Sequence, residues 1–185
     1  NITVDNNLLV NVFAESGDVK VTFGNNYTYN GTLRVSLGGI TARLSEYSNI
    51  EFFDLATIYA GGVSVEVNDD ASFDHLNIRV NAGGITMRIE AETLGRNSSI
   101  SARVEIGGVM IGSIPEGTSL GSRLRAIADI GGINLNPGDL VVIEETVNEV
   151  EIRTSNYPAP INLDIEIFTG LGGSMINQPF FVPFL

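Results

Sequence analysis

Residues 78–89 read Ile-Arg-Val-Asn-Ala-Gly-Gly-Ile-Thr-Met-Arg-Ile, and residues 33–44 repeat the pattern as Leu-Arg-Val-Ser-Leu-Gly-Gly-Ile-Thr-Ala-Arg-Leu. Apolar and polar residues alternate on both sides of the glycine pair, and this period of two predicts strands with one buried face. Before the pair we expect Leu33, Val35 and Leu37 to point inward. Glycine tolerates positive φ and lacks the Cβ that would crowd a sharp bend. Each copy therefore predicts two short strands joined by a glycine corner.

The glycine pair recurs along the whole chain at a narrow spacing. The first four intervals between pairs are 23, 22, 24 and 24 residues, and the last is 41. The corner glycines are Gly38, Gly39, Gly61, Gly62, Gly83, Gly84, Gly107, Gly108, Gly131, Gly132, Gly172 and Gly173. A strand–corner–strand unit cannot bury its apolar face alone, so repeated units are expected to stack.

These repeats predict an all-β fold, a parallel β-solenoid of about seven to eight coils of 22–24 residues with Gly-Gly corners. The alternative is an antiparallel β-sandwich, which also has short strands and frequent turns but does not need the same corner in every second strand. We expect residues 1–176 to form one solenoid domain and residues 177–185 an apolar tail rich in Pro and Phe. One coil between residues 133 and 171 is expected to lack its glycine pair.

Composition narrows the functional classes. Of the 185 residues, 43% are hydrophobic and 17% are charged. The net charge of -12 argues against nucleic acid and anionic membranes as partners, because both are negatively charged. The chain has no cysteine, so it contains no disulfide, thiolate metal site or cysteine nucleophile. No run of 18 apolar residues is present, and we expect no transmembrane segment in this chain. The first residue is Asn1 rather than Met, so we expect any targeting segment to have been removed.

Four Asn-X-Ser/Thr triplets are candidate N-glycosylation sites, at Asn1, Asn26, Asn30 and Asn97. Asn26, Asn30 and Asn97 stand in turn-like sequence, where an acceptor must lie. The triplets favour a secreted, cell-surface protein.

We expect no catalytic, cofactor or metal site. His75 is the single histidine, and no Gly-x-Ser-x-Gly elbow is present. Stacking in sequence order would place Glu105 beside Asp129, with Arg79 and Arg103 on the neighbouring column. Two carboxylates are too few for a Ca²⁺ ligand set, and a polysaccharide-acting solenoid enzyme would need several of them clustered with a basic residue.

The tandem apolar-x-apolar-x-Gly-Gly-apolar-x-apolar units resemble the Toastrack type of β-solenoid domain, and residues 161–173 are similar to the final coil of such domains. The resemblance covers roughly residues 8–176. It implies a place among the head domains of adhesin-like surface proteins or the extracytoplasmic domains of envelope proteins. It brings no catalytic motif.

The ends of the chain suggest self-association. Residues 2–13 are strand-like with no polar cap, and an open terminal coil exposes unpaired backbone groups and bare core. The tail carries large apolar side chains, which we expect either to plug the last coil of the same chain or to insert into a neighbouring copy. These tail residues are Phe180, Phe181, Val182, Phe184 and Leu185.

The sequence thus favours a non-catalytic extracellular structural protein, a filament subunit or an adhesin-like protein. Its expected partner is itself, as a homopolymer or homo-oligomer, with surface glycans or other cells as further candidates. An extracytoplasmic ligand-sensing domain is the alternative, and a polysaccharide-acting solenoid enzyme is a lesser one.

Overall fold

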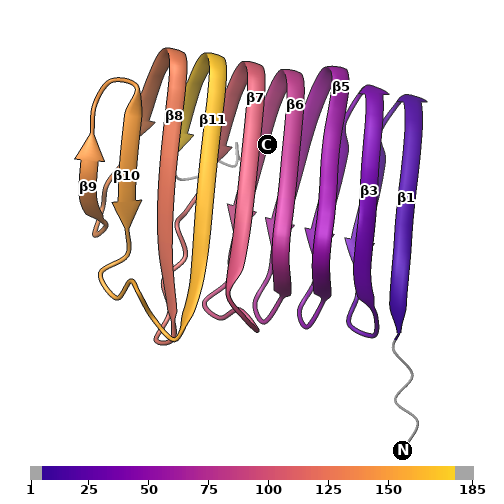
Figure 1. Cartoon of the computed structure of the whole chain (residues 1–185), viewed down its shortest axis with the longest axis horizontal. Helices are drawn as coiled ribbons and strands as arrows, with labels where there is room; N and C mark the ends of the chain where they lie inside the picture. The colour runs from indigo at the N-terminus through magenta and orange to yellow at the C-terminus, as the bar shows by residue number, and fades with distance from the viewer. Residues whose placement is uncertain (1–5, 178–185) are drawn as a thin grey trace, which may run out of the picture.

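The computed structural model describes residues 6–177, which form eleven strands and no helix. Figure 1 shows the strands side by side along one rod. The strands are β1 (Asn7–Ser16), β2 (Val19–Phe23), β3 (Thr28–Leu37), β4 (Ile40–Leu44), β5 (Asn49–Val67), β6 (Ser72–Ile89), β7 (Ser98–Ile111), β8 (Leu120–Leu135), β9 (Val141–Glu145), β10 (Glu149–Arg153) and β11 (Ile161–Ile176).

Each coil of the rod rises along a first wall, turns at the glycine corner and descends along a second wall (Figure 1). β1 with β2 and β3 with β4 make the first two coils, whereas β5, β6, β7, β11 and β8 each run through both walls. Neighbouring coils pair in parallel with their glycines in register, as Gly61 with Gly83 and Gly83 with Gly107. The described residues thus form a parallel β-solenoid of seven coils, not an antiparallel sandwich.

The first glycine of a pair cannot carry a side chain. Gly83 has φ of 141°, a region that L-residues rarely adopt, and a Cβ on it would lie 1.7 Å from the carbonyl oxygen of Gly61. The corner therefore requires glycine both for its backbone angle and for the close approach of the coil below.

The two walls enclose one continuous apolar core. The inward positions predicted from the glycine register are buried, among them Val35 and Ile40 beside one corner and Val104 at the centre of the rod. Ile133, in the second wall of β8, is partly buried against the same core.

The prediction for Leu37 is wrong. This side chain is exposed, as are Ile106, Ile130 and Leu171, which stand at the same position before their own glycine pairs. The chain already bends at the following glycine, so the residue before it lies on the outside of the corner. The alternation of the first wall therefore stops one residue earlier than the sequence pattern indicates.

The order of the coils also differs from the order of the sequence. β11 lies between β7 and β8, and the strand order is β1-β3-β5-β6-β7-β11-β8-β10-β9. Gly172 pairs with Gly107 on one side and with Gly131 on the other. Since the coils present their glycines in the same register, the last coil fits between β7 and β8 and pairs with both.

The segment expected to be a coil without glycines is instead an antiparallel hairpin. β10 pairs with the first wall of β8, and β9 pairs with β10 at the end of the sheet.

Within residues 6–177 there is no helix long and apolar enough to cross a membrane.

Candidate functional site

In the part of the chain that the structure describes, no further coil covers the core beyond the first coil. Leu8 and Val12 of β1 point inward in register with Tyr29 and Leu33 of β3. Leu8 is 41% and Val12 36% exposed, whereas Tyr29 and Leu33 are 8% and 0% exposed. The inward residues of β1 therefore have the positions of core residues without the cover of a further coil.

The outward face of β1 also exposes two large apolar side chains, which alternate with Asn7, Asn11 and Glu15. Leu9 is 70% and Phe13 62% exposed, although the residues in register with them on β3 are the polar Asn30 and Arg34. A hollow of about 390 Å³ lies beside Phe13 and is lined mainly by apolar surface. β1 thus exposes large apolar side chains on both faces, although it stands at the edge of the sheet that the described residues form.

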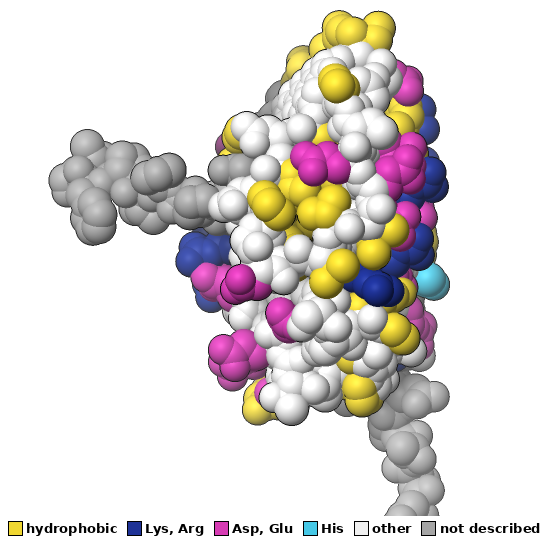
Figure 2. All heavy atoms as spheres, turned by 90° about the vertical axis from the view of Figure 1, so that its left-hand side faces the viewer, with side chains coloured by type: hydrophobic (Ala, Val, Ile, Leu, Met, Phe, Trp, Pro, Cys, Tyr) yellow, Lys and Arg dark blue, Asp and Glu magenta, His cyan; other side chains and the backbone are white. Residues whose placement is uncertain are grey.

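The opposite end of the rod is built differently. The hairpin extends the first wall of β8, and the carbonyl oxygen of Val147 accepts a hydrogen bond of 3.3 Å from the backbone N–H of Ile133. Figure 2 looks onto this end, where hydrophobic side chains are exposed together with acidic ones. The hairpin strands contribute the acidic residues Glu144, Glu145, Glu149 and Glu151.

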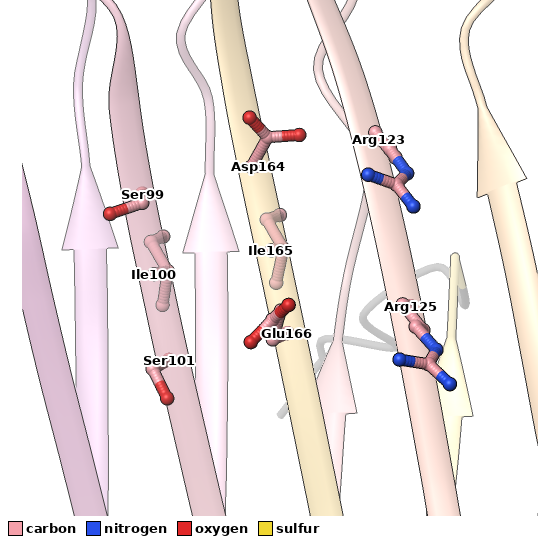
Figure 3. Close-up of a pocket in the computed structure, with 8 residues that line it drawn as sticks. All are labelled: Ser99, Ile100, Ser101, Arg123, Arg125, Asp164, Ile165 and Glu166. Carbon is pink, nitrogen blue, oxygen red and sulfur yellow. The ribbon is translucent and has the colours of Figure 1, made fainter.

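A shallow polar groove of about 320 Å³ crosses the outside of the first wall at β7, β11 and β8 (Figure 3). Arg123 and Arg125 extend away from β11 in Figure 3. Each donates to the hairpin, Arg123 to Glu151 at 3.0 Å and Arg125 to Glu149 at 2.7 Å. These hydrogen bonds raise the pKa of both arginines, so the guanidinium groups stay charged and bound to the hairpin.

Ser99 and Ser101 of β7 and the carboxylates of Asp164 and Glu166 on β11 line the other part of the groove. The hydroxyl of Tyr157 donates to Asp164 at 3.0 Å at the rim. Desolvation by burial, followed by this hydrogen bond, raises the pKa of Tyr157 above its ordinary value. The groove therefore combines hydroxyl and carboxylate groups suited to polar ligands, and its arginines are already paired.

Asp54 is a buried carboxylate on the outside of the same wall. Arg79 and Asn77 each donate to its Oδ1 at 2.8 Å, and Arg34 lies 3.4 Å from its Oδ2. A buried charge is tolerated when it is paired and hydrogen-bonded, so this cluster joins the second, third and fourth coils of the rod.

The predicted neighbourhood of Glu105 and Asp129 does not exist, because β11 separates their strands. Gly170 of β11 stands between them. Glu105 instead accepts a hydrogen bond of 2.6 Å from Arg103, whose guanidinium lies over the ring of Phe168. Nowhere in residues 6–177 do three His, Asp or Glu side chains gather closely enough to hold a metal ion.

The single histidine makes a contact that the sequence pattern did not predict. Nδ1 of His75 lies 2.6 Å from Oγ of Ser99, which donates in turn to the carbonyl oxygen of Asp74. The interval of 24 residues, equal to the coil length, was the signal that could have revealed this pair. The serine hydroxyl is engaged by a backbone acceptor, and the contact ties two coils together.

The sequons differ in their surroundings. Asn26 and Asn97 are exposed in loops. Asn30 lies within β3 rather than in a turn, and its amide nitrogen donates to Glu51 at 2.7 Å. Asn1, the fourth sequon, lies outside the described residues. The tail residues 178–185, for which we expect a role in self-association, lie outside them as well.

Comparison with known proteins supports the fold at a distance. No family model matches the sequence, and no curated protein matches it significantly. A crystal structure from Clostridium sporogenes, described as a "putative cell adhesion protein", is similar with a TM-score of 0.60 and 14% sequence identity. The similarity covers 94% of this chain and 93% of that one. At this identity the likeness establishes a shared fold.

Proposed function

We propose that the protein is a non-catalytic structural protein of the cell surface, adhesin-like or filament-forming, that associates with copies of itself through the ends of its solenoid. The observation that carries this proposal is the uncovered first coil. Within residues 6–177 no strand pairs with the outer edge of β1, and β1 exposes core-facing residues together with Leu9 and Phe13 of its outer face.

Such an end is unfavourable in an isolated subunit. Unpaired strand edges recruit further strands, and a contiguous apolar patch on a soluble protein marks an interaction site. Natural solenoids protect their terminal coils with polar caps, but β1 has Leu8, Leu9, Val12 and Phe13 at these positions. A second copy is the partner that this end fits most directly.

Other features support a surface location. The structurally similar clostridial protein is named for cell adhesion, and two exposed sequons are compatible with an extracellular chain. The separation of Glu105 from Asp129 removes the carboxylate pair that the enzyme alternative used. In an adhesin-like role, surface glycans or other cells would be the further partners.

The proposal is tested by measuring the mass of the full chain across a range of concentrations, using light scattering after size exclusion and negative-stain electron microscopy. We expect assemblies whose mass rises with concentration in steps of 19.8 kDa and falls again on dilution. A monomer of constant mass at every concentration would contradict it.

A further inference from the structure

We infer that residues 179–185 of a second copy add to the free edge of β1 as an extra strand. This inference rests on the proposed self-association and names the segment and the surface that perform it.

Alternate residues of β1 face away from the rest of the sheet. The carbonyl oxygen of Asn6 accepts a hydrogen bond of 2.9 Å from the N–H of Thr28, and the register from Asn7 to Ala14 continues without a bulge. Successive residues of a strand direct their backbone groups to opposite sides. The even-numbered residues therefore bond to β3, and the N–H groups of Leu9, Asn11 and Phe13 face the free edge.

The faces of the first coil distinguish its two strands as acceptors. β1 is apolar inward at Leu8 and Val12 and outward at Leu9 and Phe13. β2 instead alternates apolar residues with Lys20 and Thr22, which are exposed. An added strand with large apolar side chains on both faces can cover Leu9 and Phe13 outside β1, despite the polar residues between them, whereas β2 exposes no apolar side chain on its outer face.

The tail has this property. Residues 179–185 read Pro-Phe-Phe-Val-Pro-Phe-Leu. In an extended strand Phe180, Val182 and Phe184 share one face, and Phe181 and Leu185 share the other. One face can continue the core beyond Leu8 and Val12, while the other packs beside Leu9 and Phe13.

The two prolines fit the end of a sheet. Pro179 and Pro183 are four residues apart, so both direct their missing N–H to the same side of an extended strand. The opposite side keeps the N–H groups of Phe180, Val182 and Phe184 for bonding to β1. The proline side cannot donate to another strand at these positions, so the added strand closes the sheet.

The distance excludes insertion into the same molecule. Five strand spacings separate β11 from β1, which is about 24 Å at ~4.8 Å per strand. The eight residues that follow Asn177 span at most about 28 Å when fully extended. A tail that crossed the rod would have too little length left to lie along β1, so the occupant must come from another copy.

Charge argues against the hairpin end as the occupant. The first coil carries Glu15 and Asp18 beside a single lysine, and the hairpin strands are strongly acidic. The side chains of residues 178–185 carry no charge. The tail therefore meets this end without like-charge repulsion, which a direct contact with the hairpin would bring.

The test uses two variants of the 185-residue chain that each keep one half of the contact. Deletion of residues 178–185 leaves a copy that can only accept. Asn11→Pro removes an N–H that faces the free edge and leaves a copy that can only donate. We expect each variant alone to be monomeric, and an equimolar mixture to form heterodimers of about twice the 19.8 kDa chain mass.

A pair of proline substitutions in the tail tests the predicted side. Val182→Pro removes a bonding N–H, and we expect loss of assembly. Phe181→Pro places its ring on the side of Pro179 and Pro183, and we expect assembly to persist. Circular dichroism and melting of each variant verify that the solenoid stays folded.

The outcomes separate the two proposals. If the parent assembles and the tail-deleted chain still assembles, or if the mixture stays monomeric, this inference fails while self-association stands. A parent that never assembles refutes both. A monomeric parent that is destabilised by the deletion would show that the tail covers its own chain instead.

Discussion

Gly131 lies directly beside Gly172, although 41 residues separate them in the chain. A Cβ on Gly131 would lie 1.4 Å from the carbonyl oxygen of Gly172, and Gly172 stands in the same relation to Gly107 on its other side. The last coil of the sequence is therefore inserted between the two coils that precede it. β8 therefore lies two strand spacings from β7, and β11 occupies the position between them.

This insertion can be tested by cross-linking, because the chain has no cysteine of its own. Glu166 on β11 is in register with Ser101 on β7 and with Arg125 on β8. We expect the pair Ser101→Cys and Glu166→Cys to cross-link on mild oxidation, since adjacent strands lie ~4.8 Å apart. The pair Ser101→Cys and Arg125→Cys spans two spacings, beyond the ~7 Å limit for a disulfide, and serves as the control. Mass spectrometry after oxidation gives the answer, and the reverse result would mean that the coils stack in sequence order.

Gly172→Ala is expected to lower the free energy of unfolding by more than about 3 kcal/mol. Gly172 has φ of 141°, and its Cβ would lie 1.7 Å from the carbonyl oxygen of Gly107. Gly24→Ala is the matched control, because a Cβ there would meet nothing nearer than the Tyr29 hydroxyl at 3.9 Å. We expect that change to stay within about 0.5 kcal/mol. Urea denaturation followed by circular dichroism measures both, and equal stabilities would show that the corner tolerates a side chain.

Val104→Asp is expected to unfold the rod. Val104 is fully buried at the centre of the first wall. An unpaired carboxylate at this position lowers the free energy of unfolding by about 3 kcal/mol or more. Asn81→Asp introduces the same side chain at an exposed position of β6 and should leave the melting temperature nearly unchanged. A Val104→Asp variant that melts like the parent would contradict the inward register.

The glycine spacing was sufficient to predict the coil, its parallel stacking and most of its inward residues. It could not predict the order of the last coils, because Gly107, Gly131 and Gly172 present the same corner and any two of them can pair. The hairpin was missed although Val141–Glu145 and Glu149–Arg153 are short runs with a tight connection. An interval of 41 residues indicates a coil without glycines as readily as it indicates a hairpin, so the spacing alone does not distinguish the two.

The position of β11 also decides which contacts on the outside of the first wall were predictable. Arg79 and Arg103 are in register, as sequence order indicates, since the coils up to β7 stack sequentially. Glu105 and Asp129 are not neighbours, because the inserted strand lies between them. The exposed apolar side chains of the first coil were predictable, because residues 2–13 are strand-like with no polar cap, whereas any partner of this coil depends on surfaces that one chain alone does not bring together.

Stability at alkaline pH is expected to depend on Tyr157. Burial and the hydrogen bond to Asp164 raise the pKa of Tyr157 above the ordinary tyrosine value of about 10. Its contribution is therefore complete below pH 10 and is lost as the pH rises through the higher folded-state pKa. We expect the melting temperature of the parent to fall more steeply above pH 10 than that of Tyr157→Phe, which has no hydroxyl to titrate. Parallel melting curves for the two proteins across this range would contradict the assignment.

The sequons are expected to be used unequally if the protein passes through a glycosylating compartment. Attachment of a glycan consumes one hydrogen of the asparagine Nδ2 and leaves Oδ1 as an acceptor. Asn97 is exposed and uses Oδ1 to accept the N–H of Asn162 at 2.9 Å, so that contact survives modification. Asn30 already donates through Nδ2 to Glu51 and sits in a strand. Asn97 should therefore be modified first, then Asn26 in its exposed loop, and Asn30 least.

Intact mass and glycopeptide mapping of protein isolated from its native cells measure this order. Asn97→Gln should remove one glycan mass and leave the occupancy of Asn26 unchanged. Occupancy at Asn30 above that at Asn97 would contradict the argument from the amide nitrogen. A native mass equal to that of the bare polypeptide would refute modification altogether. It would also remove one support for an extracellular location, whereas the exposure of Leu8, Leu9, Val12 and Phe13 does not depend on glycosylation.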